Sequence, residues 1–458
     1  MRILLLNPPS NEKYVKESRC QHRAAVLQSV YPPLTLATIA ALLRDAGHEA
    51  RIDDAMAAGR SGKETLERAA EFAPGFVVVN TATPTLAGDL AFIEELSAGL
   101  PSARFVVFGI TAGRFSEDIA RRPAVAAVVC GEPEMTVLEL AETADWSAVK
   151  GIAAKDDGGR IFRTPPREPL DPDRLPPPAW DMVDLSPYRL PVTGERYVMV
   201  ASGRGCPHDC VFCVSPSYYG RKSRTKSVEN VMRELRFAKS LGIPSVFFFV
   251  ETFTLDRRYV RELCARIEAE RLEMTWFCNS RVDTVDLETL RAMRSAGCRI
   301  VSFGIESGSQ ILLDRAKKGT TVVQAREAVA LAKSAGLSTL GHFLLGLPGE
   351  TEATARETVS FALSLPLDFA EFNIVTPYPG SPLFESSART AFGDHDWSRY
   401  DYSRQAVRSG VDLEAARARA YRSFYLRPKI LLNMIKIYGW RSLPALSRTG
   451  ANFLRGRF

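Results

Sequence analysis

The sequence has 458 residues, of which 46% are apolar and 24% charged, and a net charge of +6. This composition is typical of a globular chain with room for about two or three domains. It excludes a membrane-spanning protein, because no apolar run approaches the roughly 18 residues of a transmembrane helix. The first 30 residues lack a signal-peptide pattern, and three of the eight Cys share one short loop. Since these three are useful only as free thiols, we expect a cytoplasmic, reducing environment and no disulfide framework.

Residues 1–145 alternate short β-rich runs with helical stretches, joined by short loops. The predicted strands are Arg2–Leu6, Glu49–Ile52, Phe76–Asn80, Arg104–Phe108 and Val125–Val129. The predicted helices cover residues 33–46, 63–73, 88–98, 114–121 and 134–143. This alternation predicts an α/β domain with a parallel, doubly wound sheet of the flavodoxin-like or Rossmann kind.

Ligands of such sheets bind beyond the carboxyl ends of the strands. Small polar and loop-forming residues, which suit a large flat ligand, stand at these ends in this sequence. The candidate contacts are Asn80, Thr81, Gly109, Gly131 and Glu132. Asp53 and Asp54 lie at the same edge, either as ligand contacts or as solvated loop acids.

Residues 146–194 are rich in proline, including Pro165-Pro166 and Pro176-Pro177-Pro178. Proline fixes φ and removes a backbone donor, so we expect an extended connector that contains the domain boundary. A second alternating pattern covers residues 195–390, with strands that begin near residues 197, 245, 274, 299, 339 and 370. Six β/α units are fewer than the eight of a full barrel, and they predict a partial, open barrel with its site at the carboxyl ends of the strands.

The first barrel strand leads into Gly205-Cys206-Pro207-His208-Asp209-Cys210-Val211-Phe212-Cys213. Thiolates hold iron–sulfur clusters, and three of them leave one iron of a cubane open for chemistry. A zinc knuckle with His208 or a distant Cys as fourth ligand is the alternative. The C-x3-C-x2-C spacing, with aromatic Phe212 before the last Cys, resembles the radical S-adenosylmethionine superfamily.

In that superfamily the cluster is a 4Fe-4S centre, so the resemblance implies that Cys206, Cys210 and Cys213 hold it. The open iron binds S-adenosylmethionine, and an electron from the cluster cleaves this cofactor to a 5'-deoxyadenosyl radical. The electron is expected to come from a low-potential donor such as flavodoxin or ferredoxin.

Polar residues at the other barrel strand ends are candidates for holding S-adenosylmethionine, together with Phe212. Glu251 can pair with the methionine ammonium or be a solvated acid, and Arg281 can clamp a carboxylate or pair with Asp283. The Gly304-Ile305-Glu306-Ser307-Gly308 run resembles the family's ribose and methionine contact. The turns at 346–350 and 376–382 also match the family, but glycine and proline there also suit loop shaping alone. His342 faces the barrel lumen or is a satisfied core histidine.

The N-terminal region resembles the cobalamin-binding domain of cobalamin-dependent radical enzymes. The resemblance rests on Leu6-Asn7-Pro8-Pro9, Tyr31-Pro32-Pro33-Leu34, Ala46-Gly47-His48-Glu49 and Cys130-Gly131-Glu132-Pro133-Glu134. It departs from some cobalamin proteins in having no Asp-x-His-x-x-Gly motif to give cobalt a histidine ligand. A flavodoxin-like domain that only packs on the barrel is the alternative.

Together the two regions resemble the anaerobic magnesium-protoporphyrin IX monomethyl ester cyclase and its relatives. The resemblance implies attack on an unactivated carbon of an apolar substrate, lipid or tetrapyrrole-like, by methyl transfer or oxidative cyclisation. A cobalamin-independent radical enzyme and a non-catalytic iron–sulfur or cobalamin sensor stay open. A methylthiotransferase fits less well, because the N-terminal domain contains only Cys20 and Cys130 for a second cluster.

The C-terminal extension, residues 391–458, carries most of the basic character. From Arg404 onward, 12 Lys and Arg stand against two acids. A helix is predicted over Asp412–Tyr425, followed by a basic amphipathic segment over Lys429–Trp440. That segment either lies on an anionic membrane surface or caps the barrel, and no nucleic-acid recognition module accompanies it.

Overall fold

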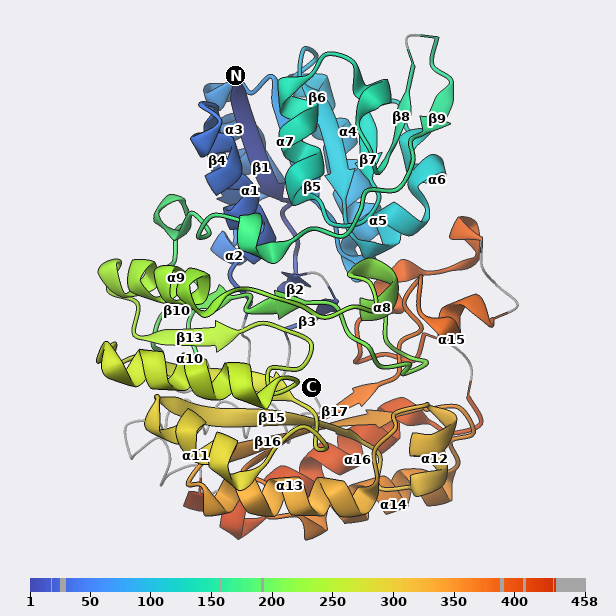
Figure 1. Cartoon of the computed structure of the whole chain (residues 1–458). Coiled ribbons are helices and arrows are strands. Elements are labelled where there is room, and N and C mark those ends of the chain that lie inside the picture. Colours follow the sequence, from blue (N-terminus) through green and yellow to red (C-terminus); the bar gives the residue numbers. More distant parts are fainter. Residues whose placement is uncertain are drawn as a thin grey trace.

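The structure is a computed structural model that describes residues 1–17, 19–24, 30–156, 158–190, 193–387, 391–406, 409–430 and 432–433. It has an N-terminal α/β sheet domain and a second, larger α/β unit built on a separate parallel sheet. Figure 1 shows the N-terminal sheet above and the second sheet below it. The predicted fold class is confirmed.

The N-terminal sheet has seven strands in the order β4-β1-β5-β6-β7-β8-β9. Its strands are β1 (Arg2–Asn7), β4 (Glu49–Asp54), β5 (Phe76–Asn80), β6 (Arg104–Phe108), β7 (Ala127–Val129), β8 (Ile152–Lys155) and β9 (Ile161–Arg163). The first five pair in parallel, whereas β8 and β9 join antiparallel. The five strands predicted from the sequence are therefore the parallel part of this sheet.

Helices cover both faces of this sheet, because successive apolar residues of a strand point to opposite faces. Ile3 and Leu5 of β1 pack in one core cluster with α1 and α7, and Leu4 and Leu6 pack in another with α3 to α6. The helices are α1 (Leu34–Asp45), α2 (Ala55–Ala58), α3 (Gly62–Phe72), α4 (Leu86–Gly99), α5 (Ile110–Arg114), α6 (Ser116–Ala120) and α7 (Glu134–Glu142). Two short helices, α5 and α6, replace the single helix predicted over 114–121.

Two antiparallel hairpins were not predicted. The first is formed by β2 (Tyr14–Glu17) and β3 (Cys20–Arg23), and the second by β8 and β9. The β8–β9 hairpin lies in the segment expected to be an extended connector, where it extends the N-terminal sheet. We propose that the N-terminal domain reaches to Arg163 and that the connector begins after it.

The second sheet is entirely parallel, in the order β10-β13-β14-β15-β16-β17. Its strands are β10 (Tyr197–Val200), β13 (Ser245–Phe248), β14 (Thr275–Ser280), β15 (Cys298–Glu306), β16 (Ser338–Leu345) and β17 (Phe369–Ile374). The helices between them are α9 (Val228–Ser240), α10 (Arg257–Ala269), α11 (Leu287–Ser295), α12 (Gln310–Arg315), α13 (Val322–Ser334) and α14 (Glu352–Ser364). These six strands match the predicted β/α units of an open barrel.

Polar N-caps set the starts of these helices. Ser227, Asp256, Asp286, Thr321 and Thr351 each accept a hydrogen bond from a backbone N–H of the first turn. Helices α10, α11 and α14 begin seven to nine residues beyond the preceding strand of the sheet, and α9 and α13 begin farther on, so loops that carry the candidate site follow the strand ends.

The C-terminal helix α16 (Leu413–Tyr425) confirms the predicted Asp412–Tyr425 helix and packs on β17. Arg417 Nε donates to the carbonyl oxygen of Phe372 at 2.8 Å, and the Tyr421 hydroxyl accepts from the Phe372 N–H at 3.2 Å. Most of the predicted amphipathic segment over Lys429–Trp440 lies outside the described residues. Among the residues that are described, no helix is long and apolar enough to span a membrane.

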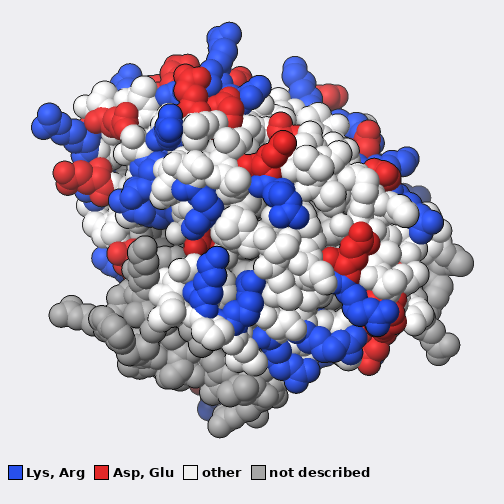
Figure 2. Space-filling model, turned by 90° about the horizontal axis from the view of Figure 1, so that it is seen from below, with Lys and Arg blue, Asp and Glu red and all other residues white. Residues whose placement is uncertain are grey.

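Figure 2 shows the molecule from below, where Lys and Arg side chains are interspersed with acidic and uncharged ones. The described part of the chain is therefore not uniformly basic on this face.

Buried ion pairs join the two domains. Arg204 in β11 (Gly203–Arg204) contacts Glu132 at 2.7 Å and Glu134 at 2.5 Å, and Arg224 contacts Glu132 at 2.8 Å. At most 12% of any of these side chains is exposed. The turn after β7 is thereby fixed against β11, which follows the first barrel strand.

We expect Arg204→Met to lower the apparent free energy of unfolding by about 3 kcal/mol, because two buried carboxylates lose their main cation. Urea unfolding followed by circular dichroism measures this change. The matched control is Arg114→Met, since Arg114 also joins the domains, to Glu385 at 2.9 Å, but both side chains are 41% exposed. Its expected cost is below about 1 kcal/mol. Equal effects of the two substitutions would contradict the assignment of the docking energy to Arg204.

Candidate active site

The three-cysteine loop is tied to the barrel by backbone contacts. The Cys206 N–H donates to Gly220 O at 3.2 Å, and the Val211 N–H donates to Ala316 O at 3.0 Å. Gly205 has φ +90°, and a Cβ there would lie 2.3 Å from the Lys222 carbonyl oxygen. Only glycine fits this position, so the sequence Gly205-Cys206 is a requirement of the loop's shape.

The thiols of the loop lie close enough to influence one another's ionisation. Burial raises the pKa of the Cys210 thiol to about 11, and the nearby Cys213 adds to this effect. Burial also raises the pKa of Cys206, and Cys213 again contributes. The Lys318 ammonium acts in the opposite direction on Cys210, as does the Arg281 guanidinium on both thiols. Metal binding requires thiolates, and these two cations stabilise them.

Three soft sulfur donors on one loop fit an iron–sulfur cluster with an open coordination position. Within the described residues, no three His, Cys, Asp or Glu side chains are arranged as a metal site, and this holds for the loop thiols too. His208 Nε2 is buried without a hydrogen-bond partner, so the case against a zinc knuckle rests on the three sulfur donors. This donor set favours the cluster over a zinc knuckle.

Lys318 is a site residue that the sequence analysis missed. Its ammonium lies 2.6 Å from Glu306 Oε1, and the two side chains are only 6% and 9% exposed. Burial lowers the pKa of Lys318, but Glu306 and the Cys210 thiol together raise it above its ordinary value. Lys318 follows α12 in a Lys-Lys-Gly turn, and no local sequence signal connects that turn with the cysteine loop.

Glu251 stands just beyond β13 and pairs with Arg19, which comes from the N-terminal domain. Arg19 Nη1 lies 3.0 Å from Glu251 Oε1, and Arg19 Nη2 donates to Val250 O at 2.9 Å. The second carboxylate oxygen of Glu251 is buried without a hydrogen-bond partner. An unpartnered acceptor at this strand end fits the predicted contact with a ligand ammonium.

Arg281 forms the ion pair with Asp283 that the sequence left as one of two alternatives. Its Nε and Nη2 donate to the two Asp283 oxygens at 2.9 and 2.8 Å, and Nη2 also donates to Lys318 O. The neighbouring Ser280 hydroxyl is buried and unpartnered. Buried polar atoms without partners are costly, so Glu251 indicates room for a polar ligand at its strand end, whereas Ser280 lies on the outward face of β14.

The remaining candidates of this group differ in their surroundings. Glu306 lies in the left-handed region at φ 66° and is paired with Lys318. The Ser307 hydroxyl is buried and bonded to Thr358 at 2.9 Å. Phe212 packs against the small apolar cluster that contains Leu312 and Leu347. Ser307 therefore already has a hydrogen-bond partner in Thr358. Phe212 anchors the cysteine loop on the apolar cluster.

At the N-terminal sheet edge, most predicted contacts are bonded within the chain. Asn80 donates to Asn7 and to Lys16 O, and the Thr81 hydroxyl donates to Phe108 O. A Cβ on Gly109 would collide with Thr81 O at 2.4 Å, so this glycine is needed for packing. The Glu132 carboxylate is held by Arg204 and Arg224, as described above.

Gly131 is different, because it borders open space. Its φ is +107°, and nothing lies within 4 Å of where a Cβ would stand. The amides, hydroxyls and glycines at this edge are the neutral groups that suit an amide-rich macrocycle. The residues present therefore fit cobalamin in donor chemistry, with Gly131 as the position that leaves room for backbone contact.

The β2–β3 hairpin lies between the two sheets (Figure 1). Lys16 pairs with Asp89 at 2.7 Å, and Gln21 accepts from the Thr83 N–H at 2.8 Å. Glu17 accepts from Thr35, while burial raises the pKa of Glu17 to about 7. The hairpin is held at the sheet edge by these polar contacts, and it brings Arg19 to the barrel.

The acids at the end of β4 are not solvated loop residues. Asp53 pairs with Arg60 and Arg68, and Asp54 is buried and accepts from Asn7 and from the Tyr188 hydroxyl at 2.7 Å. Their carboxylates are thus engaged by the chain itself.

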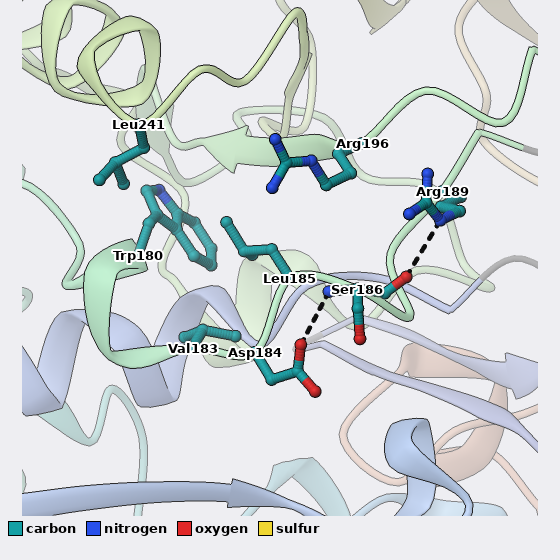
Figure 3. Close-up of a pocket in the computed structure, with 8 residues that line it drawn as sticks. All are labelled: Trp180, Val183, Asp184, Leu185, Ser186, Arg189, Arg196 and Leu241. Carbon is teal, nitrogen blue, oxygen red and sulfur yellow. Dashed lines mark hydrogen bonds between the residues drawn. The ribbon is translucent and has the colours of Figure 1, made fainter.

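A surface pocket of 370 Å³ lies at the connector, not at the cysteine loop. Figure 3 shows Trp180, Leu185 and Leu241 facing one another there, beside the hydrogen bonds from the Ser186 N–H to Asp184 and from Arg189 to Ser186 O. None of the candidate site residues lines it.

Comparison with known proteins agrees with this division of the chain. Residues 200–362 match the Radical SAM superfamily, and residues 22–141 match the B12 binding domain. An uncharacterized methyltransferase of Pyrococcus horikoshii is 33% identical over 448 residues, which cover 95% of each chain. The anaerobic magnesium-protoporphyrin IX monomethyl ester cyclase of Cereibacter sphaeroides is 29% identical over 91% of this chain and 70% of its own.

Among solved structures, the radical S-adenosylmethionine methyltransferase TsrM from Kitasatospora setae superimposes with a TM-score of 0.68. It is 22% identical, and the match covers 86% of this chain and 79% of that one. This similarity shows a shared fold. That structure has cobalamin and a [4Fe-4S] cluster bound.

The chain belongs to the radical S-adenosylmethionine superfamily, in the group that carries a B12 binding domain. It is an enzyme of this group, whose cofactors are a 4Fe-4S cluster, S-adenosylmethionine and cobalamin. Enzymes of this superfamily need a reductant.

We expect Cys206→Ala, Cys210→Ala and Cys213→Ala each to abolish cluster binding, because two thiolates do not hold a cubane. Iron and acid-labile sulfide per chain, measured after anaerobic reconstitution, check this expectation. Cys264→Ala is the matched control, since Cys264 is buried on α10 away from the loop. It should keep about four iron atoms per chain. Full iron content in any of the three loop variants would contradict the assignment.

Proposed function

We propose that the protein is a cobalamin-dependent radical S-adenosylmethionine enzyme that methylates an unactivated carbon of an apolar substrate. The observation that carries the proposal is the three-thiol loop at the carboxyl ends of the barrel strands, docked against the edge of a B12-type sheet. The methyltransferase of Pyrococcus horikoshii, which matches almost the whole chain, supports methyl transfer.

Cys206, Cys210 and Cys213 would hold the cluster in this proposal. When bound, the cluster and S-adenosylmethionine supply a 5'-deoxyadenosyl radical, and methylcobalamin supplies a methyl group. Lys318 and Arg281 would favour the thiolate form of Cys210, because both cations act to lower the pKa that burial raises. These two cations would thus supply positive charge next to the thiolates of the loop.

Other residues would hold S-adenosylmethionine. Glu251 Oε2, which has no partner in the chain, would accept from the methionine ammonium, and Arg281, already paired with Asp283, would also meet its carboxylate. Glu306 is already neutralised by Lys318, so it can bond sugar hydroxyls without adding net charge. Ser307 and Phe212 would shape this part of the site.

Cobalamin would meet the N-terminal sheet edge at Gly131 and its neighbours. The candidates Asn80, Thr81 and Gly109 then act mainly by shaping that edge, since each is packed or bonded within the chain. Glu132 would act by holding the domains together.

Oxidative cyclisation is the second candidate reaction, and the relationship to the protoporphyrin ester cyclase favours it. The same relationship supports a tetrapyrrole-like substrate over a lipid. We also infer a cytoplasmic enzyme reduced by a flavodoxin or ferredoxin. Contact of the basic tail with an anionic membrane surface remains a prediction.

The test is anaerobic incubation of the cluster-reconstituted enzyme with cobalamin, S-adenosylmethionine and a low-potential reductant. We expect both 5'-deoxyadenosine and S-adenosylhomocysteine, because radical formation and methyl transfer leave these two products. Cys206→Ala is the control and should give neither. Deoxyadenosine without S-adenosylhomocysteine would favour cyclisation, and absence of both from the wild-type enzyme would overturn the proposal.

A further inference from the structure

The barrel lumen is open to solvent along one face of its strands. In β16, alternate residues are partly exposed and fully buried, so Leu340, His342 and Leu344 face the lumen while Phe343 and Leu345 pack outward. The same alternation in β14 turns Phe277 and Asn279 inward. The lumen therefore has accessible walls that can contact a substrate.

One wall of this lumen is aromatic. The rings of Phe247 and Phe277 on neighbouring strands are stacked, with centroids 4.7 Å apart and an interplanar angle of 8°. Tyr31 of the N-terminal domain approaches Phe247 edge to face at 5.5 Å. Phe247 itself is buried, so Phe277, the partly exposed ring of this stack, is the one that a flat apolar skeleton can contact.

The opposite wall, on β16 and β17, carries a polar pair. His342 Nδ1 lies 3.1 Å from Glu371 Oε2, and the side chains keep 29% and 35% of their surface exposed. The other imidazole nitrogen of His342, Nε2, is buried without a hydrogen-bond partner. His342 lies beside Gly304 of β15, over which the Lys318 ammonium reaches, so the pair adjoins the site of the cysteine loop.

Glu371 sets the state of the imidazole. Burial lowers the pKa of His342, but the hydrogen bond and the charge of Glu371, with a contribution from Glu306, raise it overall. His342 is thereby favoured as an imidazolium whose Nδ1–H is held by Glu371, and its Nε2–H becomes a donor that lacks an acceptor.

The charged groups around the His342–Glu371 pair are themselves largely balanced by groups of opposite charge. Glu371 faces His342 and Glu306 faces Lys318, while burial lowers the pKa of His22 on the hairpin and keeps that ring neutral. Asp401 stands 4.0 Å from Arg23 on the hairpin side, and Arg417 lies near Glu371 and donates to Phe372 O. An additional carboxylate would bring an uncompensated charge into the lumen, whereas a neutral oxygen would not.

We propose that His342 and Glu371 form a specificity site for a neutral carbonyl oxygen on a flat, apolar substrate. The carbonyl accepts a hydrogen bond from His342 Nε2, and the ring system lies toward Phe247 and Phe277. This inference rests on the proposed function for its substrate, and it narrows the substrate to one with a carbonyl beside its apolar skeleton.

The test uses three naphthalene probes and the full-length, cluster-reconstituted protein. Anaerobic equilibrium dialysis measures the dissociation constants of 2-acetylnaphthalene, 2-ethylnaphthalene and 2-naphthoate. We expect the ketone to bind roughly three- to tenfold more tightly than the ethyl compound, as one neutral hydrogen bond allows. The naphthoate should bind more weakly than the ketone.

In His342→Leu the preference for the ketone should vanish, while the ethyl compound binds as it does to wild type, which also shows that the lumen is intact. Glu371→Gln should reduce the preference, and His48→Leu, at a distant N-terminal position, should retain it. Equal binding of ketone and ethyl compound to wild type, a preference that persists in His342→Leu, or tighter binding of naphthoate would overturn the proposal. Since no turnover is measured, failure of methyl transfer leaves this result unaffected.

Discussion

A buried ion pair between Lys16 of β2 and Asp89 of α4 underlies the arrangement of the site. The atoms are 2.7 Å apart, and the side chains are 2% and 1% exposed. This pair fixes the β2–β3 hairpin across the carboxyl edge of the N-terminal sheet, and Arg19 of the same hairpin reaches Glu251 in the barrel. Loss of one partner of such a pair typically costs about 3–5 kcal/mol, so the hairpin is strongly held. The hairpin consequently contacts both the sheet edge and the barrel mouth.

Burial of charge is the second constraint on this region. Three thiols, two glutamates and several cations are packed where isolated charges are costly, and each charged group has a partner of opposite sign. Lys318 is central to this charge arrangement, because its ammonium contacts Glu306 and acts to lower the pKa of the Cys210 thiol. In the lumen, His342 is likewise paired with Glu371. Among the buried polar atoms without a partner there, Glu251 Oε2 and His342 Nε2 are where we expect ligands.

Much of this architecture was predictable, because strands and loops leave local signals. The apolar runs of both sheets, the glycine and proline turns and the C-x3-C-x2-C spacing placed the parallel strands and the cysteine loop correctly. The β2–β3 hairpin was missed because its inward residues, such as Lys16 and Gln21, are polar and are satisfied by distant partners. Lys318 and the partner of Glu251 were missed for the same reason: ion pairs between remote segments have no sequence period.

The central claim is that the B12-type sheet edge and the cysteine loop face a single interior. Pulsed electron paramagnetic resonance on the enzyme loaded with cob(II)alamin and a reduced cluster tests it most directly. The account predicts a dipolar interaction between the two spins that disappears in Cys206→Ala. Two independent signals in the doubly loaded wild-type enzyme would contradict it.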